Sequence, residues 1–226
     1  MAMDIAGMWK KVIAIYIISL IVICAAFFLP AGTLDYWQAW VYVIILFVPV
    51  LFVLIHFMRT DPEFLERRLR FKEKENAQKR IVSIASIIFL IGFLIPGLDR
   101  RFGWSSVSPE ISVAADITMF IGYLLIILVF KENRYASRTI GVETGQTVVS
   151  TGPYAFIRHP MYLGVIIMYL STPIALGSYW AILPFLLTPP ILVFRILNEE
   201  EVLLRGLKGY KEYCAKVRYR LIPFVW

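Results

Sequence analysis

Two groups of polar residues stand at the ends of apolar segments, and their side chains are suited to holding charged groups. The first is Arg158-His159-Pro160, directly before the fifth apolar stretch. Because proline is tolerated in the first turn of a helix, we expect a helix to begin at Pro160. Arg158 and His159 would then lie beside free backbone N–H groups that favour a carboxylate or another anion. An equally simple interpretation is that Arg158 reaches lipid headgroups and His159 caps the helix.

The second group follows the last apolar stretch and contains Arg195, Glu199 and Glu200. Arg195 and Glu199 stand at positions i and i+4, so they share one face of a helix. Such a pair could hold an anionic group against a cationic one. An ordinary solvated helix end is the alternative, and we prefer it for Glu201. For Arg195 and Glu199 we favour a site, because ionisable groups at membrane depth usually mark one.

Several other kinds of chemistry are not expected. The chain has two histidines and two cysteines, and their scattered positions predict neither a metal site nor a disulfide. No glycine-rich nucleotide motif follows a predicted strand, and no P-loop occurs. Any cofactor must therefore be held by the two helix ends and by the loop between them.

The composition defines the elements that position these residues. Of the 226 residues, 59% are apolar or aromatic and 17% are charged. Soluble domains carry about 25% charged residues. The excess of apolar residues excludes a disordered chain, a coiled coil and an ordinary soluble enzyme. What remains is an integral membrane protein.

Apolar runs along the chain predict its spans. Spanning the hydrocarbon core takes about 20 helical residues. Four runs come close to that length, at residues 12–29, 36–57, 81–98 and 111–130. Asp116 lies in the fourth run, and we expect it at the membrane interface. The runs predict an all-α polytopic membrane helix bundle.

The last apolar stretch, 160–194, carries no charge and is too long for one span. A turn at Gly177-Ser178-Tyr179-Trp180 predicts a helical hairpin of two short helices, 161–176 and 181–197. A re-entrant hairpin is the competing interpretation. We therefore expect five to six transmembrane helices, with a C-terminal helical hairpin and a cytoplasmic cofactor pocket.

The basic residues orient the chain. All but two of the 23 Lys and Arg residues, the exceptions being Arg100 and Arg101, fall on one side of this topology. The positive-inside rule then predicts a multi-pass protein with both termini and the active site in the cytoplasm. Because topology accounts for these charges, we expect contact with anionic lipid and no nucleic-acid partner. Residues 1–130 are interpreted as scaffold, and 131–226 as the segment that carries the chemistry.

Residues 131–226 resemble the isoprenylcysteine carboxyl methyltransferase family and the related membrane phospholipid methyltransferases. The order and spacing of the two polar groups make the resemblance fairly specific, whereas either group alone is weak. The matching residues are Gly152-Pro153-Tyr154, Arg158-His159-Pro160-Met161-Tyr162, Gly164, Arg195-Ile196 followed by Glu199-Glu200, Tyr210 with Tyr213, and Leu221-Ile222-Pro223.

The resemblance implies an enzyme that transfers a methyl group from S-adenosyl-L-methionine to a lipid or lipid-linked acceptor. The acceptor expected first is a carboxylate such as that of an isoprenylcysteine, and the alternative is a phospholipid amine. Arg195 would orient the acceptor, and Arg195 and Glu199 would be catalytic. The residues implied for the cofactor are Gln146, Tyr154, Arg158, His159, Pro160, Tyr162, Glu199 and Glu200.

Two features of the sequence keep other classes open. The tail from Tyr210 to Pro223 is also similar to the ends of membrane sterol reductases, which use NADPH. Those proteins usually carry Asn in place of Met161 and an acid in place of Gly164, so we favour the methyltransferase. The tail also departs from the methyltransferase pattern at Leu207-Lys208-Gly209, where it is one residue shorter. A transporter or structural bundle would explain the spans but not the two polar groups.

Overall fold

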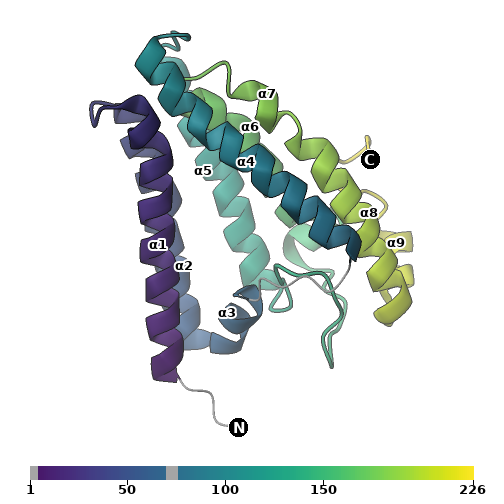
Figure 1. Ribbon diagram of the computed structural model, residues 1–226. Helices are drawn as coiled ribbons and strands as arrows, with labels where there is room; N and C mark the ends of the chain where they lie inside the picture. The colour runs from purple at the N-terminus through teal and green to yellow at the C-terminus, as the bar shows by residue number, and fades with distance from the viewer. Residues whose placement is uncertain (1–4, 70–75) are drawn as a thin grey trace.

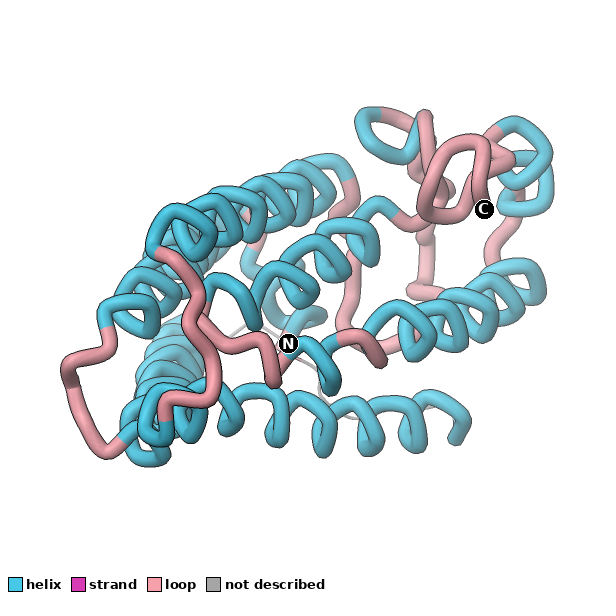
Figure 2. The backbone as a smooth tube through the Cα atoms, turned by 90° about the horizontal axis from the view of Figure 1, so that it is seen from above, coloured by secondary structure: helices cyan, strands magenta, loops and turns pink. Residues whose placement is uncertain are grey.

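The computed structural model describes residues 5–69 and 76–226, and within them the regular structure is entirely helical. The long helices form a bundle in which α1 and α2 stand side by side, and α4 and α8 run next to each other at an angle to them (Figure 1). In the view from above, the C-terminal segment lies to one side of the helices (Figure 2). The predicted all-α membrane bundle is confirmed.

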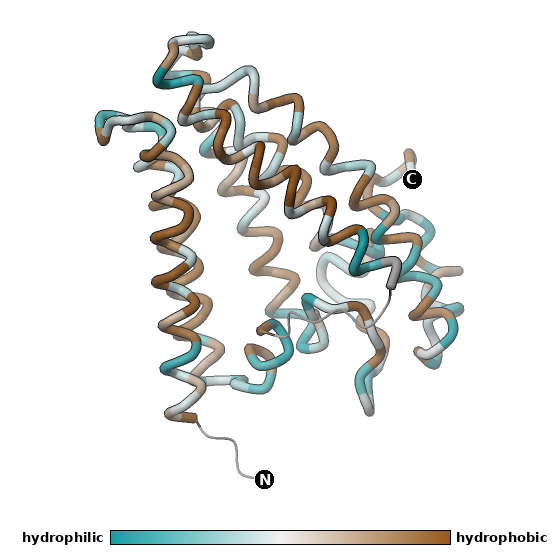
Figure 3. Tube along the Cα trace, in the orientation of Figure 1, coloured by the Kyte–Doolittle hydropathy of each residue, from teal (hydrophilic) through white to brown (hydrophobic). Residues whose placement is uncertain are grey.

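Five stretches of the described residues are long and apolar enough to cross a membrane. Each exceeds the apolar run from which it was predicted, because the helices continue into polar residues at their ends. Hydropathy along the trace shows apolar middles and hydrophilic ends (Figure 3). The chain is thus a multi-pass membrane protein. The stretches are α1 (Ile5–Ala31), α2 (Trp37–Thr60), α4 (Asn76–Phe102), α5 (Pro109–Glu132) and Ile182–Gly206.

The C-terminal hairpin is present, with one difference in its second arm. Its first arm is α6 (Pro160–Ala175), and the chain turns at Gly177, whose φ of 73° favours glycine. The second arm is divided into α7 (Ile182–Phe185) and α8 (Thr188–Gly206), so the single helix predicted over 181–197 is wrong. Two prolines, at 189 and 190, lack the N–H groups of a continuous helix and fit instead in the first turn of α8.

Two glycines bring α5 and α6 into close contact. A Cβ on Gly122 would lie 2.8 Å from the Gly164 carbonyl oxygen, and one on Gly164 would lie 2.7 Å from the Gly122 carbonyl oxygen. Small residues at such a crossing let two membrane helices approach closely. This contact fixes the position of the first turns of α6, directly after Arg158 and His159.

Asp116, which the sequence placed at the membrane interface, is buried among the helices of the bundle. It is 3% exposed, and both carboxylate oxygens are buried without a hydrogen-bond partner among the described residues. Because α5 begins at Pro109, Asp116 lies two turns into the helix, next to the core residues Ala115 and Met119. Asp116 is buried because other helices pack against this part of α5. The sequence of α5 alone does not show which helices these are.

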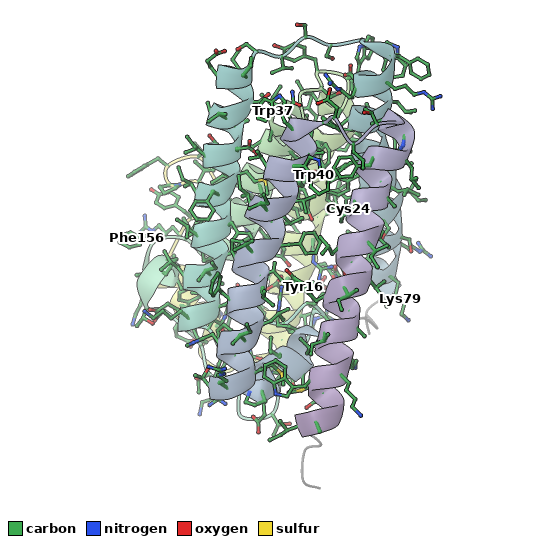
Figure 4. All side chains as sticks on the ribbon, turned by 90° about the vertical axis from the view of Figure 1, so that its left-hand side faces the viewer. Tyr16, Cys24, Trp37, Trp40, Lys79 and Phe156 are labelled. Carbon is green, nitrogen blue, oxygen red and sulfur yellow. The ribbon has the colours of Figure 1, made fainter. Side chains whose placement is uncertain are left out.

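The bundle has two distinct ends. Trp37 and Trp40 are exposed near one end of α2, and Lys79 lies towards the other end of the bundle (Figure 4). Exposed tryptophans are typical of a membrane–water interface. We call the second end the site end, because α2, α5 and α8 finish there and α4 and α6 begin there. It also holds two short helices, α3 (Pro62–Arg68) and α9 (Tyr210–Lys216).

Candidate functional site

A pocket at the site end is enclosed by the loop after α5, the start of α6, the end of α8 and α9. Its empty volume, including its open mouth, is about 830 Å³. Residues from both polar groups predicted from the sequence meet in its wall. The predicted residues that line it are Gln146, Tyr154, Arg158, His159, Tyr162 and Glu199.

Pro160 and Glu200 lie behind this wall. Pro160 is buried in the first turn of α6, as the sequence predicted, and His159 occupies the N-cap position without a side-chain cap hydrogen bond. Glu200 is 4% exposed and forms ion pairs with Arg158, at 2.9 Å, and with Arg220, at 2.8 Å. The His159 Nε2 atom lies 3.2 Å from the same carboxylate. Glu200 therefore holds in place two side chains that line the pocket.

The C-terminal tail binds the backbone N–H groups of Arg158 and His159, directly before α6. Arg158 N donates to the Tyr219 carbonyl and His159 N donates to the Arg220 carbonyl, both at 2.9 Å. These two N–H groups are therefore not available to a ligand. The tail, more than 50 residues further along the chain, pairs with this segment like a short strand, which local sequence does not reveal. At Arg158 and His159 the side chains remain available to a ligand.

Tyr162 joins the two polar groups. Its hydroxyl donates to Glu199 Oε2 at 2.5 Å and accepts from Arg195 Nε at 3.1 Å. Arg195 and Glu199 thus share a face of α8, as predicted. Arg195, however, does not line the pocket, and its Nη2 donates to the Arg138 carbonyl oxygen at 2.6 Å. Its guanidinium lies behind Tyr162, between α6 and α8.

Gln78, at the start of α4, was missed by the sequence analysis. It is fully buried, accepts from Arg195 Nη1 at 2.7 Å, and donates to Asn198 Oδ1 at 2.7 Å. Arg68, at the end of α3, lies next to the pocket residue Met161. Both belong to the basic stretch 59–80, which indicated topology alone, and no local signal identified either. Residues 70–75 of that stretch lie outside the described residues.

Helix α9 brings two tyrosines to the pocket. Gly209 precedes it with a φ of 86°, and the shorter turn still places both Tyr210 and Tyr213 in the wall. Tyr213 donates to the Tyr154 carbonyl oxygen at 2.8 Å. The Tyr210 hydroxyl is buried and has no partner among the described residues. It is available to a bound ligand, and the shared Tyr-x-x-Tyr spacing was the only sequence signal for it.

Electrostatically, the pocket keeps its phenols neutral. Burial raises the pKa of Tyr154 to about 12, and the Asn133 side chain, which donates to its hydroxyl at 2.9 Å, opposes the rise. Burial also raises the pKa values of Tyr210 and Tyr213. At neutral pH these side chains are hydrogen-bonding groups rather than bases.

Comparison with known proteins supports a membrane methyltransferase. Residues 111–209, slightly less than half of the chain, match the family described as phospholipid methyltransferase, which belongs to the same group as the isoprenylcysteine carboxyl methyltransferases. This segment runs from α5 to the turn before α9 and contains both polar groups.

A curated relative of another activity also matches part of the chain. It is the Delta(14)-sterol reductase TM7SF2 of Mus musculus, 35% identical over 94 residues, which are 39% of this chain and 22% of the mouse protein. The alignment thus spans about a fifth of the relative's length.

Proposed function

We propose that this protein is an integral membrane methyltransferase that uses S-adenosyl-L-methionine to methylate a lipid-linked acceptor. The observation that carries the proposal is the meeting of His159, Tyr162 and Glu199 in one pocket. These residues come from two motifs on α6 and α8, within the segment that matches the methyltransferase family. We further propose that the site faces the cytoplasm with both termini, following the distribution of basic residues.

The residues of the pocket fit the proposed cofactor. S-adenosylmethionine supplies a methyl group on a positively charged sulfonium and also carries an ammonium, a carboxylate and an adenine. Glu199 offers negative charge, and Arg158 and His159 offer donors for a carboxylate. The Arg158 Nε and Tyr210 hydroxyl groups are buried without partners among the described residues, so a polar ligand would satisfy them. Apolar residues that would pack against adenine are Val148, Val149, Leu203 and Leu207.

The chemistry of the walls favours a carboxylate acceptor. Methyl transfer from a sulfonium is an in-line displacement, so positioning and exclusion of water supply most of the catalysis. A carboxylate needs no base, whereas a protonated amine must first lose a proton. The raised pKa values of Tyr154, Tyr210 and Tyr213 make phenolate bases unsuitable at neutral pH, so an amine acceptor would depend on Glu199 as its base. An isoprenylcysteine carboxylate is therefore the first acceptor to test. The family match supports the alternative, a phospholipid amine.

A reductase is the second candidate, because the mouse relative carries that name. One contact in this structure argues against it. The acid that sterol reductases usually carry at the position of Gly164 has no room here, because even a Cβ would lie 2.7 Å from the Gly122 carbonyl oxygen. Close packing of α5 against α6 thus separates this chain from the reductase pattern.

Two measurements on detergent-purified protein test the proposal. Calorimetry should show binding of S-adenosylmethionine or its demethylated product, weakened in His159→Ala and Glu199→Ala but not in Glu201→Ala, whose glutamate is exposed. A tritiated-methyl transfer assay should label either membrane lipid extract or a farnesyl-cysteine analogue, tested in parallel. Binding of NADPH with no response to either sulfur ligand would favour the reductase and overturn the proposal.

A further inference from the structure

Arg67 and Arg68 are neighbours at the end of α3 with very different surroundings. Arg67 donates to the Arg134 carbonyl oxygen at 3.0 Å and lies 3.7 Å from the Glu63 carboxylate. The partly buried guanidinium of Arg68 has no carboxylate partner among the described residues. Arg67 is thus neutralised within the protein, whereas no carboxylate among residues 5–69 and 76–226 compensates the charge of Arg68.

Arg68 is nevertheless held in a defined position. Its guanidinium carbon lies 4.7 Å from the centre of the Phe130 ring, and its Nη1 lies 3.8 Å from the sulfur of Met161. Phe130 is in the last turn of α5, and Met161 is in the first turn of α6 and lines the pocket. Arg68 therefore stands where the end of α5 and the start of α6 meet the edge of the pocket.

Other cations surround Arg68. The pKa of Arg68 is lowered to about 10, mainly by burial and then by the nearby Arg138 and Arg195, while the pocket tyrosines Tyr162 and Tyr154 oppose the shift. Desolvating a charge without a counter-charge is costly, and adding like charges nearby increases the cost. Such an arrangement is stabilised when an anion binds.

We propose that Arg68 binds the anionic group of the lipid acceptor, a carboxylate or a phosphate, at the edge of the pocket between α5 and α6. This inference rests on the proposed function, and it makes Arg68 a residue that determines acceptor specificity. The guanidinium offers planar paired donors to either anion. The apolar part of the acceptor would extend from this point towards the membrane.

Binding of charged and neutral amphiphiles tests the proposal in detergent, without turnover. N-acetyl-farnesylcysteine is compared with its methyl ester, and phosphatidylglycerol with diacylglycerol, by tryptophan fluorescence. We expect at least one anion to bind about 10- to 100-fold more tightly than its neutral counterpart. Arg68→Met should abolish the preference and Arg68→Lys should reduce it. Arg80→Met, which removes an exposed charge at the start of α4, should keep it.

The thermal stability of the ligand-free protein separates binding from folding. If Arg68 has no counter-charge, Arg68→Met should unfold at the same temperature or higher, whereas Arg67→Met should unfold lower. Equal binding of anions and neutral counterparts by the wild type, an unchanged preference in Arg68→Met, or a strong loss of stability in that variant overturns the proposal. A different outcome is that anions bind preferentially through Arg68 but no methyl transfer is detected. That result would refute the proposed function and still support the anion site.

Discussion

Gln78 and Arg195, separated by 117 positions in the chain, are joined by a 2.7 Å hydrogen bond from Arg195 Nη1 to Gln78 Oε1. The same amide donates to Asn198, one turn further along α8. Gln78 therefore attaches the start of α4 to the helix that carries Glu199. Since Arg195 also donates to Tyr162, the N-terminal half of the chain supports the position of a pocket residue.

Removing this amide should loosen α4 from α8. Gln78→Ala and Asn198→Ala should each lower the free energy of unfolding by about 1–3 kcal/mol, because buried polar partners are left unsatisfied. The double variant should lose less than the sum, with a coupling of about 0.5 kcal/mol or more. Unfolding in mixed micelles measures all three. Strict additivity would show that the two amides stabilise the protein independently.

The sequence was most informative where a physical constraint acts locally. Bilayer thickness fixes span length, so apolar runs located the membrane helices. Helical periodicity placed Arg195 and Glu199 on one face, and the helix start at Pro160 brought His159 to the pocket. These predictions needed no knowledge of which helices are neighbours.

Features that depend on contacts between distant segments could not be predicted from the sequence. Gln78 stands in a charged stretch with nothing to mark it as buried, and Asp116 is covered by helices that its own run does not specify. The tail carbonyls that occupy the N–H groups of Arg158 and His159 come from Tyr219 and Arg220. Each depends on packing, which a single sequence leaves undetermined.

Two consecutive glutamates allow a matched test of the buried ion pairs. Glu200 is paired with two arginines and buried, whereas Glu201 is exposed and paired with Arg205 at 2.9 Å. Glu200→Gln should lower the free energy of unfolding by about 3–5 kcal/mol, because the arginines lose their counter-charge. Glu201→Gln should change it by less than about 1 kcal/mol. Thermal or denaturant unfolding in detergent measures both, and similar effects would show that burial of Glu200 adds nothing.

The glycine contact between α5 and α6 should not tolerate a methyl group. In Gly122→Ala and Gly164→Ala the new Cβ meets a backbone carbonyl, so the helices must separate. We expect losses of about 1–3 kcal/mol, typical of overpacking. Gly141→Ala is the control, because a Cβ there meets nothing within 4 Å. Unfolding in mixed micelles measures the three variants, and a fully stable Gly164→Ala would contradict the close contact.

The two tyrosines of α9 should respond in opposite ways to loss of the hydroxyl. Tyr213→Phe removes the bond to the Tyr154 carbonyl and should cost about 1 kcal/mol of stability. Tyr210→Phe removes a buried hydroxyl without a partner among the described residues, so the ligand-free protein should be as stable or more stable. Calorimetry should nevertheless show S-adenosylmethionine binding about tenfold more weakly in Tyr210→Phe. Unchanged affinity would mean that the hydroxyl does not meet the cofactor.

Tyr154 should make stability depend on alkaline pH. Its pKa rises from 10.0 to about 12 on folding, so between these values the unfolded chain loses a proton that the folded protein keeps. The stabilisation is complete below pH 10 and disappears as the pH rises through 12, amounting to about 2 kcal/mol. Tyr154→Phe loses the Asn133 bond at every pH but should decline less steeply over this window. The measurement is the unfolding midpoint of the wild type and of Tyr154→Phe at pH 8, 10 and about 11.5. Because both proteins contain Tyr210 and Tyr213, the difference between their pH profiles reports on Tyr154. Parallel curves would show that the Tyr154 phenol titrates alike in both states and is not shielded by the pocket.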